Sequence, residues 1–434
     1  MAFSENERTT KYQGEYVIGF DLTDTYSQIS FGSTESEEVT SFSMIAGGDD
    51  YLIPTVLYKR REVSQWYVGK EALNKPQADG FLVDKLVSKA LESDEITVGE
   101  ESYRVSALIA LFMKRLLSMV NYYAPLNKVS SVMITVDVLN DRIIKTLTEA
   151  VKSLGLKTEN IYFQNHMESF YFYTIYQPRE LWNREVLLVD FTSDVVKTYR
   201  MECNVRTTPI VAFIDPEVYS NLYTAGISDV LSGTQESRRL DEELLLKLND
   251  TMHGRLFSSV YFVGEAFRQD IFKESVKYLC QKGRVFEGNN LYAKGACYGA
   301  KNKIVKTILS ESHVFLGNDK LKSNVGINVL NRGEKAYLPL LDAGVNWFEA
   351  KKECDLILNL GNKLSFVITP LTGKNPEVVD ITLFDLPKRP QKATRIRVNI
   401  EMIAESKMQV KIKDLGFGEL FPASDIEWNE VINL

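Results

Sequence analysis

The chain has 434 residues, of which 44% are hydrophobic and 25% are charged, a composition typical of a soluble protein with a large buried core. Its 51 basic and 58 acidic side chains give a net charge of −7, which disfavours binding to nucleic acid or to an anionic membrane. The 4 cysteines and 3 histidines are scattered, so we expect no disulfide framework, no structural metal site and no Ser-His-Asp triad.

We expect no export signal in the N-terminal segment. Residues 1–16 lack the apolar core of a signal peptide, and no later apolar run approaches the roughly 20 residues that span a bilayer. We therefore expect a cytoplasmic protein.

The first part of the chain alternates strands with helices. Residues 14–31 predict two strands around a turn, with Asp21 at the end of the first strand. The elements expected up to residue 165 are short strands at 51–58 and 65–73, a helix at 105–123, a strand at 130–137, a helix at 140–156 with Asn140 as its N-cap, and a strand at 160–165. Helices that alternate with buried strands indicate a largely parallel sheet covered on both faces.

The same pattern restarts near residue 184. Residues 184–202 again predict an apolar strand, an aspartate at its end (Asp190), a polar turn and a second strand. The elements expected next are a helix at 237–254, a strand at 258–267, a helix at 268–281 and a small-residue helix at 288–302. The repeated order indicates a duplicated α/β domain.

The composition changes after about residue 312. Alternating segments at 356–371, 378–386, 395–403 and 407–415, separated by turn residues, predict a separate antiparallel β domain, most simply a sandwich. The short apolar segment 313–319 is interpreted as the linker to this domain.

Several motifs resemble those of the DnaK-type 70-kDa heat-shock chaperones, in the same order along nearly the whole chain. VIGFDLTDTYS (17–27) and LLVDFTSDVVK (187–197) resemble the two phosphate loops of that family, V-I-G-I-D-L-G-T-T-N-S and F-D-L-G-G-G-T-F-D. VYFVGEAFR (260–268) is similar to the adenosine motif V-x-L-V-G-G-x-x-R. The segments similar to the substrate-binding β-sandwich are NVGINVLNRG (324–333), LFDLPKRP (383–390) and VKIKDLGFGEL (410–420).

The resemblance implies an α/β two-lobed actin-like (ribonuclease H-like) ATPase fold, followed by a separate all-β sandwich domain. The expected boundaries are 14–188 for lobe I, 189–312 for lobe II, 313–319 for an apolar interdomain linker and 320–430 for the sandwich. The stretch between Asp190 and Gly264 is much shorter than in the chaperones, so we expect the subdomain that clamps adenine to be reduced or absent.

The two phosphate loops depart from the family pattern. In the chaperones, glycines let backbone N–H groups approach the phosphates of ATP or ADP bound with Mg²⁺. Here the first loop carries Thr23 and Asp24, and the second carries Thr192, Ser193 and Asp194, so side chains and negative charges occupy the phosphate space. Like charges ~4 Å apart repel by ~1 kcal/mol in water and by more when partly buried.

Other positions of the family's nucleotide site are only partly retained. The phosphate-contacting lysine aligns with Asp84 and the water-positioning glutamate aligns with His166, so no residue is assigned a catalytic role. The nucleotide and Mg²⁺ positions that the resemblance leaves are Asp21, Thr25, Asp190, Gly264 and Gly295. Strand-end aspartates that bond their own turns, and glycines that serve tight turns, are the alternative interpretation of the same residues.

The sandwich offers a second type of site. In the family, its groove receives an extended hydrophobic peptide. The groove candidates in the aligned segment are Leu338, Leu340, Val345, Trp347 and Phe348, and ordinary sandwich core is the alternative for them. The family's helical lid has no counterpart in this sequence, so we expect a bound peptide to leave quickly.

Three functional hypotheses follow. The first is a chaperone-like pseudo-ATPase, an inactive or very slow ATPase scaffold that binds a protein or peptide partner through its sandwich or lobes. The second is a working ATP-dependent switch in which Mg²⁺ near Asp21 and Asp190 offsets the acidic loops. The third is an actin-like structural or assembly protein, and the sequence leaves the oligomeric state open.

Overall fold

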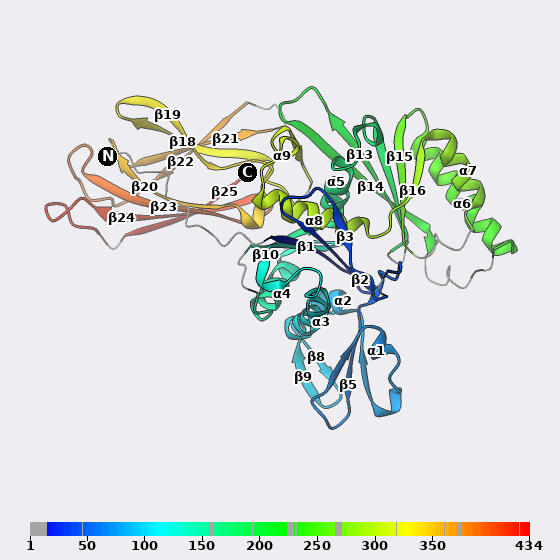
Figure 1. Ribbon diagram of the computed structural model, residues 1–434. Coiled ribbons are helices and arrows are strands. Elements are labelled where there is room, and N and C mark those ends of the chain that lie inside the picture. The colour runs from blue at the N-terminus through cyan, green and yellow to red at the C-terminus, as the bar shows by residue number, and fades with distance from the viewer. Residues whose placement is uncertain are drawn as a thin grey trace. The chain divides into compact units, whose positions relative to one another are not determined.

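The structure is a computed structural model that describes residues 15–45, 47–156, 160–192, 195–223, 230, 232–264, 271–317, 319–359, 361–371, 375–424 and 426–434. The chain divides into two compact units, residues 1–314 and residues 315–434. Figure 1 shows the helices and strands of both units.

A mixed sheet organises the first half of the first unit. Its strands are β1 (Tyr16–Leu22), β2 (Tyr26–Ser33), β3 (Val39–Ser41), β4 (Ile53–Pro54), β10 (Val129–Val136) and β11 (Ile161–Asn165). They lie in the order β11-β10-β1-β2-β3, with β4 beside β2. Strand β1 is parallel to β10 and antiparallel to β2.

Helices alternate with the parallel strands of this sheet. They are α3 (Val105–Val120), α4 (Asp141–Lys152) and α5 (His166–Ile175). Every residue of β10 is buried, as expected for a strand covered on both faces. The predicted N-cap of α4 is confirmed, because Asn140 Oδ1 accepts a hydrogen bond from the Ile143 N–H at 2.9 Å.

A small arm lies in the chain between β3 and α3. Its elements are β5 (Leu57–Arg60), β6 (Trp66–Val68), α1 (Lys70–Leu73), β7 (Gly80–Val83), α2 (Leu86–Glu92), β8 (Glu95–Val98) and β9 (Glu101–Arg104). Strand β5 lies between β6 and β7, and β8 pairs with β9. The strand predicted over 65–73 is wrong beyond Val68, because Gly69 has a φ of +61°, which ends the strand and precedes α1.

A second mixed sheet organises the other half of this unit. Its strands are β12 (Glu185–Asp190), β13 (Val195–Asn204), β14 (Ile210–Tyr223), β15 (Phe257–Val263), β16 (Arg284–Glu287) and β17 (His313–Phe315). They lie in the order β16-β15-β12-β13-β14-β17. Strand β12 is parallel to β15 and antiparallel to β13, just as β1 is parallel to β10 and antiparallel to β2.

The helices of this half follow the same order as those of the first half. They are α6 (Gln235–Met252), α7 (Lys273–Lys282), α8 (Leu291–Ile304) and the short α9 (Ile308–Ser312). Figure 1 shows α6 and α7 together on one side of the second sheet. Apart from the arm, β1 to α5 and β12 to α8 therefore repeat one succession of strands and helices.

The segment predicted as a linker is partly a strand. Residues 313–315 form β17 at the edge of the second sheet next to β14, and the boundary between the two units falls after Val314. An apolar His-Val-Phe run has strand propensity, and pairing at a sheet edge satisfies its backbone groups. The boundary between the two units therefore falls within the predicted linker 313–319, whose first residues are also a strand, while residue 318 lies outside the described part of the chain.

Helix α8 packs against the first sheet although it follows a strand of the second sheet. It contacts β1, β2, β10 and α5. A Cβ atom added at Gly19 would lie 2.2 Å from the Ala293 carbonyl oxygen, and one added at Gly295 would lie 1.9 Å from the Ser169 carbonyl oxygen. Only glycine permits this approach of α8 to β1 and α5.

We predict that Gly295→Ala destabilises the protein by about 1–3 kcal/mol, because the added methyl group meets backbone and outweighs the ~1 kcal/mol gain in helix propensity. Gly299→Ala is the matched control on the same helix, since its methyl group first meets the movable amide of Gln164. Urea unfolding of both variants checks the prediction. Equal losses would mean that the backbone contact at Gly295 is not the constraint.

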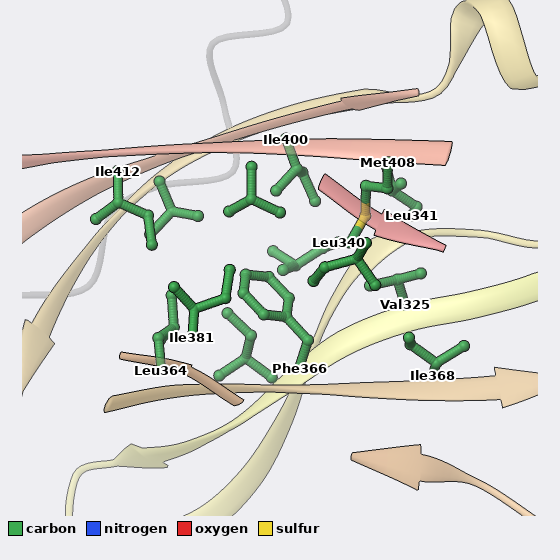
Figure 2. Packing of buried hydrophobic residues seen from close by; sticks show 14 of the residues in the cluster. Val325, Leu340, Leu341, Leu364, Phe366, Ile368, Ile381, Ile400, Met408 and Ile412 are labelled. Atoms are coloured by element: carbon green, nitrogen blue, oxygen red, sulfur yellow. The ribbon is translucent and has the colours of Figure 1, made fainter. Parts of the chain in front are cut away.

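The second unit is a sandwich of two antiparallel sheets. One sheet contains β18 (Ser323–Asn331), β19 (Glu334–Leu341), β21 (Lys363–Pro370) and β22 (Glu377–Thr382) in the order β19-β18-β21-β22. The other contains β20 (Lys351–Leu358), β23 (Thr394–Ala404), β24 (Lys407–Gly416) and β25 (Glu427–Asn433) in the order β20-β23-β24-β25. Figure 2 shows the apolar side chains between them, with Phe366 facing Ile400 and Ile412 from the opposite sheet.

A buried ion pair joins the segment between β22 and β23 to strand β24. The Arg389 guanidinium donates two hydrogen bonds of 2.6 Å to the Asp414 carboxylate, and neither side chain is exposed beyond 4%. The same carboxylate accepts hydrogen bonds from the Gly416 N–H, the Ser424 N–H and the Ser424 hydroxyl. Burial alone would raise the pKa of Asp414, but Arg389 and these hydrogen bonds hold it well below its usual range.

We predict that Asp414→Asn costs about 3–5 kcal/mol of stability at neutral pH, because it leaves Arg389 buried without a counter-charge. The folded pKa of Asp414 lies below the unfolded value of about 4, so the stabilisation is complete above that pH and is lost as the pH falls towards the folded pKa. The variant should therefore show a shallower loss of stability in acid, measured by urea unfolding of the whole chain at several pH values.

The control is Asp355→Asn, which breaks the half-exposed pair of Asp355 with Arg397 and should cost less than about 1 kcal/mol. Equal effects of the two substitutions would contradict a special role for the buried pair.

Candidate functional site

The two strand-end aspartates are both buried in the first unit. Asp21 ends the central strand β1 of the first sheet and is 4% exposed, while Asp190 ends the central strand β12 of the second sheet and is 1% exposed. A buried carboxylate is costly unless it is paired or hydrogen-bonded. The partners of these two side chains therefore define the site.

Asp21 is paired with a histidine. His166 Nε2 lies 2.8 Å from Asp21 Oδ1, and both side chains are buried. His166 is the first residue of α5, which begins where β11 ends, and Asn165 caps this helix by accepting a hydrogen bond from the Glu168 N–H. The parallel pairing of β1, β10 and β11 brings the histidine to the same sheet edge as Asp21.

Asp190 is bonded to a tyrosine and to its own turn. The Tyr292 hydroxyl donates to Asp190 Oδ2, and the Thr192 N–H and hydroxyl donate to Asp190 Oδ1 at 2.7 and 2.6 Å. The Tyr292 ring stacks on the His166 ring, with centroids 3.9 Å apart and planes 8° from parallel. Asp21, His166, Tyr292 and Asp190 thus form one continuous chain of contacts, named here the Asp21–Asp190 network.

A second polar contact lies beside this network. Lys197 of β13 donates to Asp137 Oδ2 at 2.7 Å, and Asp137 directly follows β10. His166 Nδ1 lies 4.0 Å from Asp137 Oδ1, which is too long for a hydrogen bond, and Nδ1 has no hydrogen-bond partner among the residues that the structure describes. Asp137 and Lys197 are partly exposed, so they form the open side of the site.

Electrostatics favour a proton between Asp21 and His166. Burial raises the pKa of the Asp21 carboxyl. Burial alone would lower the pKa of His166, but the nearby carboxylates of Asp21, Asp137 and Asp190 raise it overall. Both shifts favour the protonated form of each side chain relative to its ordinary pKa. Burial and then Asp190 raise the pKa of Tyr292, so its hydroxyl remains a donor.

The residues present do not fit a bound Mg²⁺-nucleotide. Asp21 and Asp190, the positions that the resemblance assigns to that ligand, are already bonded to His166 and to Tyr292 with Thr192. Among the described residues, no cluster of three or more His, Cys, Asp or Glu side chains is arranged to hold a metal ion. The arrangement can hold a proton and join the two sheets.

Asp24 of the first loop forms hydrogen bonds with the N-terminus of a helix. Asp24 Oδ1 accepts hydrogen bonds from the Val87 and Ser88 N–H groups at 2.8 and 3.0 Å, and the Ser88 hydroxyl donates to its other oxygen. Asp24 therefore caps the N-terminus of α2 from a distant part of the chain. Thr23 closes its own turn with Tyr26, and Thr25 is exposed at the hairpin tip.

We predict that Asp24→Ala lowers stability by about 1 kcal/mol through loss of this cap. It should not create nucleotide binding, because the Asp21–Asp190 network stays in place. Asp84→Ala, which removes a half-exposed partner of Lys89, is the control and should stay within about 0.5 kcal/mol of the parent protein. Thermal unfolding and titration with Mg·ATP are the measurements, and saturable binding by Asp24→Ala would contradict the cap interpretation.

The two predicted site glycines have packing roles. Gly264 has a φ of +105°, and a Cβ atom there would lie 2.8 Å from the Phe191 carbonyl carbon. Gly295 faces Ser169 across the contact between α8 and α5. In the second phosphate loop, Thr192 bonds Asp190, while Ser193 and Asp194 lie outside the described residues.

The predicted groove residues pack with the sandwich core. Leu340 is buried in the core cluster shown in Figure 2, and Leu338, Val345 and Trp347 pack against that cluster. Phe348 lies edge-on to Trp347, with ring centroids 5.6 Å apart. For Leu338, Leu340, Val345 and Trp347 the core alternative fits better than the groove interpretation, because these side chains contact the interior of the sandwich.

Tyr292, Asp137 and Lys197 were not predicted as site residues. The sequence could have indicated Asp137, because it follows a buried strand, much as Asp21 and Asp190 lie at the ends of their strands. Parallel strands bring such ends to the same edge of a sheet. Tyr292 carried no such signal, because its position depends on where α8 crosses the first sheet.

Comparison with known proteins assigns the chain to a family without a known function. The model of the family of unknown function DUF5716, C-terminal part, matches residues 38–318, which is more than half of the chain, so the protein belongs to this family. The domain of unknown function DUF8552 matches residues 320–434. No curated protein matches the chain. In the described part, no helix is both long and apolar enough to cross a membrane.

Proposed function

We propose that this protein is a heat-shock-chaperone-like pseudo-ATPase, a cytoplasmic scaffold with a degenerate nucleotide site and an actin-like two-lobed domain. The two sheets share one strand order, which supports the two-lobed fold. Each sheet also carries an aspartate near the end of its central strand. The four-strand sheets of the second unit support a chaperone-like sandwich.

The observation that carries the proposal is the Asp21–Asp190 network. A nucleotide would have to break the contacts of Asp21 with His166 and of Asp190 with Tyr292, and breaking a buried pair costs about 3–5 kcal/mol. A micromolar site corresponds to about 8 kcal/mol, and each 1.4 kcal/mol is a factor of about ten. The cost of breaking one pair would move such a site to an affinity between about 0.1 mM and a few mM, and breaking both pairs would weaken it further.

Partner binding is assigned to the sandwich. The large apolar side chains that are exposed in that unit include Phe384 at 67%, Phe417 at 46% and Leu420 at 87%. Exposed aromatic and aliphatic groups are common anchors for protein or peptide partners. They are better placed for this role than the groove candidates Leu338, Leu340, Val345 and Trp347, which contact the core.

We predict no saturable heat when the purified chain is titrated with Mg·ATP or Mg·ADP up to millimolar concentration. Asp21→Ala and Asp190→Ala should give the same result, because neither aspartate is available to a nucleotide in the parent protein. Isothermal calorimetry, with a thermal-shift assay at the same concentrations, is the measurement. Tight binding that disappears in the two aspartate variants would overturn the pseudo-ATPase proposal and favour an ATP-dependent switch.

A further inference from the structure

The two sheets of the first unit are joined by two crossing helices. Helix α5 leads from β11 of the first sheet towards β12 of the second. Helix α8 follows β16 of the second sheet and packs on β1 and β10 of the first. The two helices contact each other where Gly295 meets Ser169.

The Asp21–Asp190 network lies where these helices begin. His166 is the first residue of α5 and Tyr292 is the second residue of α8, and their rings stack. The outer ends of the network are Asp21 on the first sheet and Asp190 on the second. A line of buried contacts therefore runs from the end of one central strand to the end of the other.

A second bridge runs parallel to the first. Lys197 belongs to β13 of the second sheet, and its partner Asp137 follows β10 of the first sheet. The two bridges meet at His166, whose Nδ1 faces Asp137. Within the described residues, the two sheets share no strand pairing, so these side-chain contacts and the crossing helices set their relative orientation.

We propose that the two bridges form an internal latch that holds the two sheets in one fixed orientation without any ligand. In a two-lobed protein whose cleft binds a ligand, contacts to that ligand hold the lobes together. Here His166 and Tyr292 provide the contacts to Asp21 and Asp190 from within the chain. The inference rests on the proposed pseudo-ATPase function, since it gives the former ligand positions a mechanical role.

The test measures the separation of the sheets directly. Spin labels are placed at Lys145 on α4 and Lys277 on α7, whose side chains are 63% and 69% exposed. Cys203, Cys280 and Cys354 are replaced by serine in every sample, and Cys297 stays because it is buried. Pulsed electron-spin distance measurements are made without nucleotide.

The parent protein should give one narrow distance distribution. The double variant Tyr292→Phe with Lys197→Met removes one hydrogen bond from each bridge while keeping side-chain volume, and its distribution should become at least twofold wider. Tyr298→Phe is the control, because Tyr298 also lies on α8 but stacks on Tyr176 away from both aspartates. It should leave the distribution unchanged.

A double variant with the parent's distance distribution and the parent's circular dichroism would overturn the latch. If the double variant does not fold, Tyr292→Phe and Lys197→Met are measured separately, and each should widen the distribution by a smaller factor. Unchanged distributions in both single variants would also overturn it. Nucleotide binding in the calorimetric experiment would overturn the pseudo-ATPase proposal. It would not decide whether the latch exists, because the distances are measured without nucleotide.

Discussion

The close approach of α8 to β1 and α5 is the constraint on which the site depends. At Gly19 and Gly295 the backbone of one element takes the space that a side chain would need. Because α8 lies this deep, Tyr292 reaches His166 at stacking distance and its hydroxyl reaches Asp190. A side chain at either glycine would push the helix outwards and separate the two rings. Gly19 and Gly295 do not contact the aspartates, but they therefore determine which side chains can form hydrogen bonds with them.

Buried carboxylates repeatedly organise distant parts of this chain. Asp21 and Asp190 join the two sheets through His166 and Tyr292, and Asp24 caps a helix more than sixty positions away. Asp414 holds Arg389 and the turn around Ser424 in the second unit. For Asp24, Asp190 and Asp414, several donors offset the free energy lost by removing an anion from water, and each of the four aspartates contacts a segment that is remote in sequence.

Much of the secondary structure follows from sequence periodicity. The apolar run at 105–123 contains α3, the cap at Asn140 is where the Asn side chain predicts it, and the strand at 130–137 matches β10 within a residue. Local chemistry also explains the errors, since the prediction of a strand through Gly69 overlooked the positive φ that glycine allows there. The strand at 313–315, within the predicted linker, was not expected because the sheet edge beside which it lies is far away in sequence.

The candidate site was harder to predict than the fold. Asp21 and Asp190 could be located from their strands, but their partners depend on tertiary contacts. His166 looked like a lone histidine because Asp21 is distant in sequence, and Asp24 looked like a blocked phosphate loop because its helix α2 is also distant. The groove residues were chosen from a resemblance, and alternation along β19 places Leu338 and Leu340 on the core side of the sandwich.

The repeated order of elements gives the Asp21–Asp190 network an internal symmetry. In each half, the aspartate that ends the central strand bonds an aromatic ring in the first turn of the last helix: Asp21 with His166 in one half, and Asp190 with Tyr292 in the other. The two rings then stack nearly parallel at the junction. This is the geometry of an isologous interface, in which two copies of one unit present the same surface to each other. The junction is thus organised like a homodimer contact within a single polypeptide, with the stacked rings as one of several contacts between the two halves.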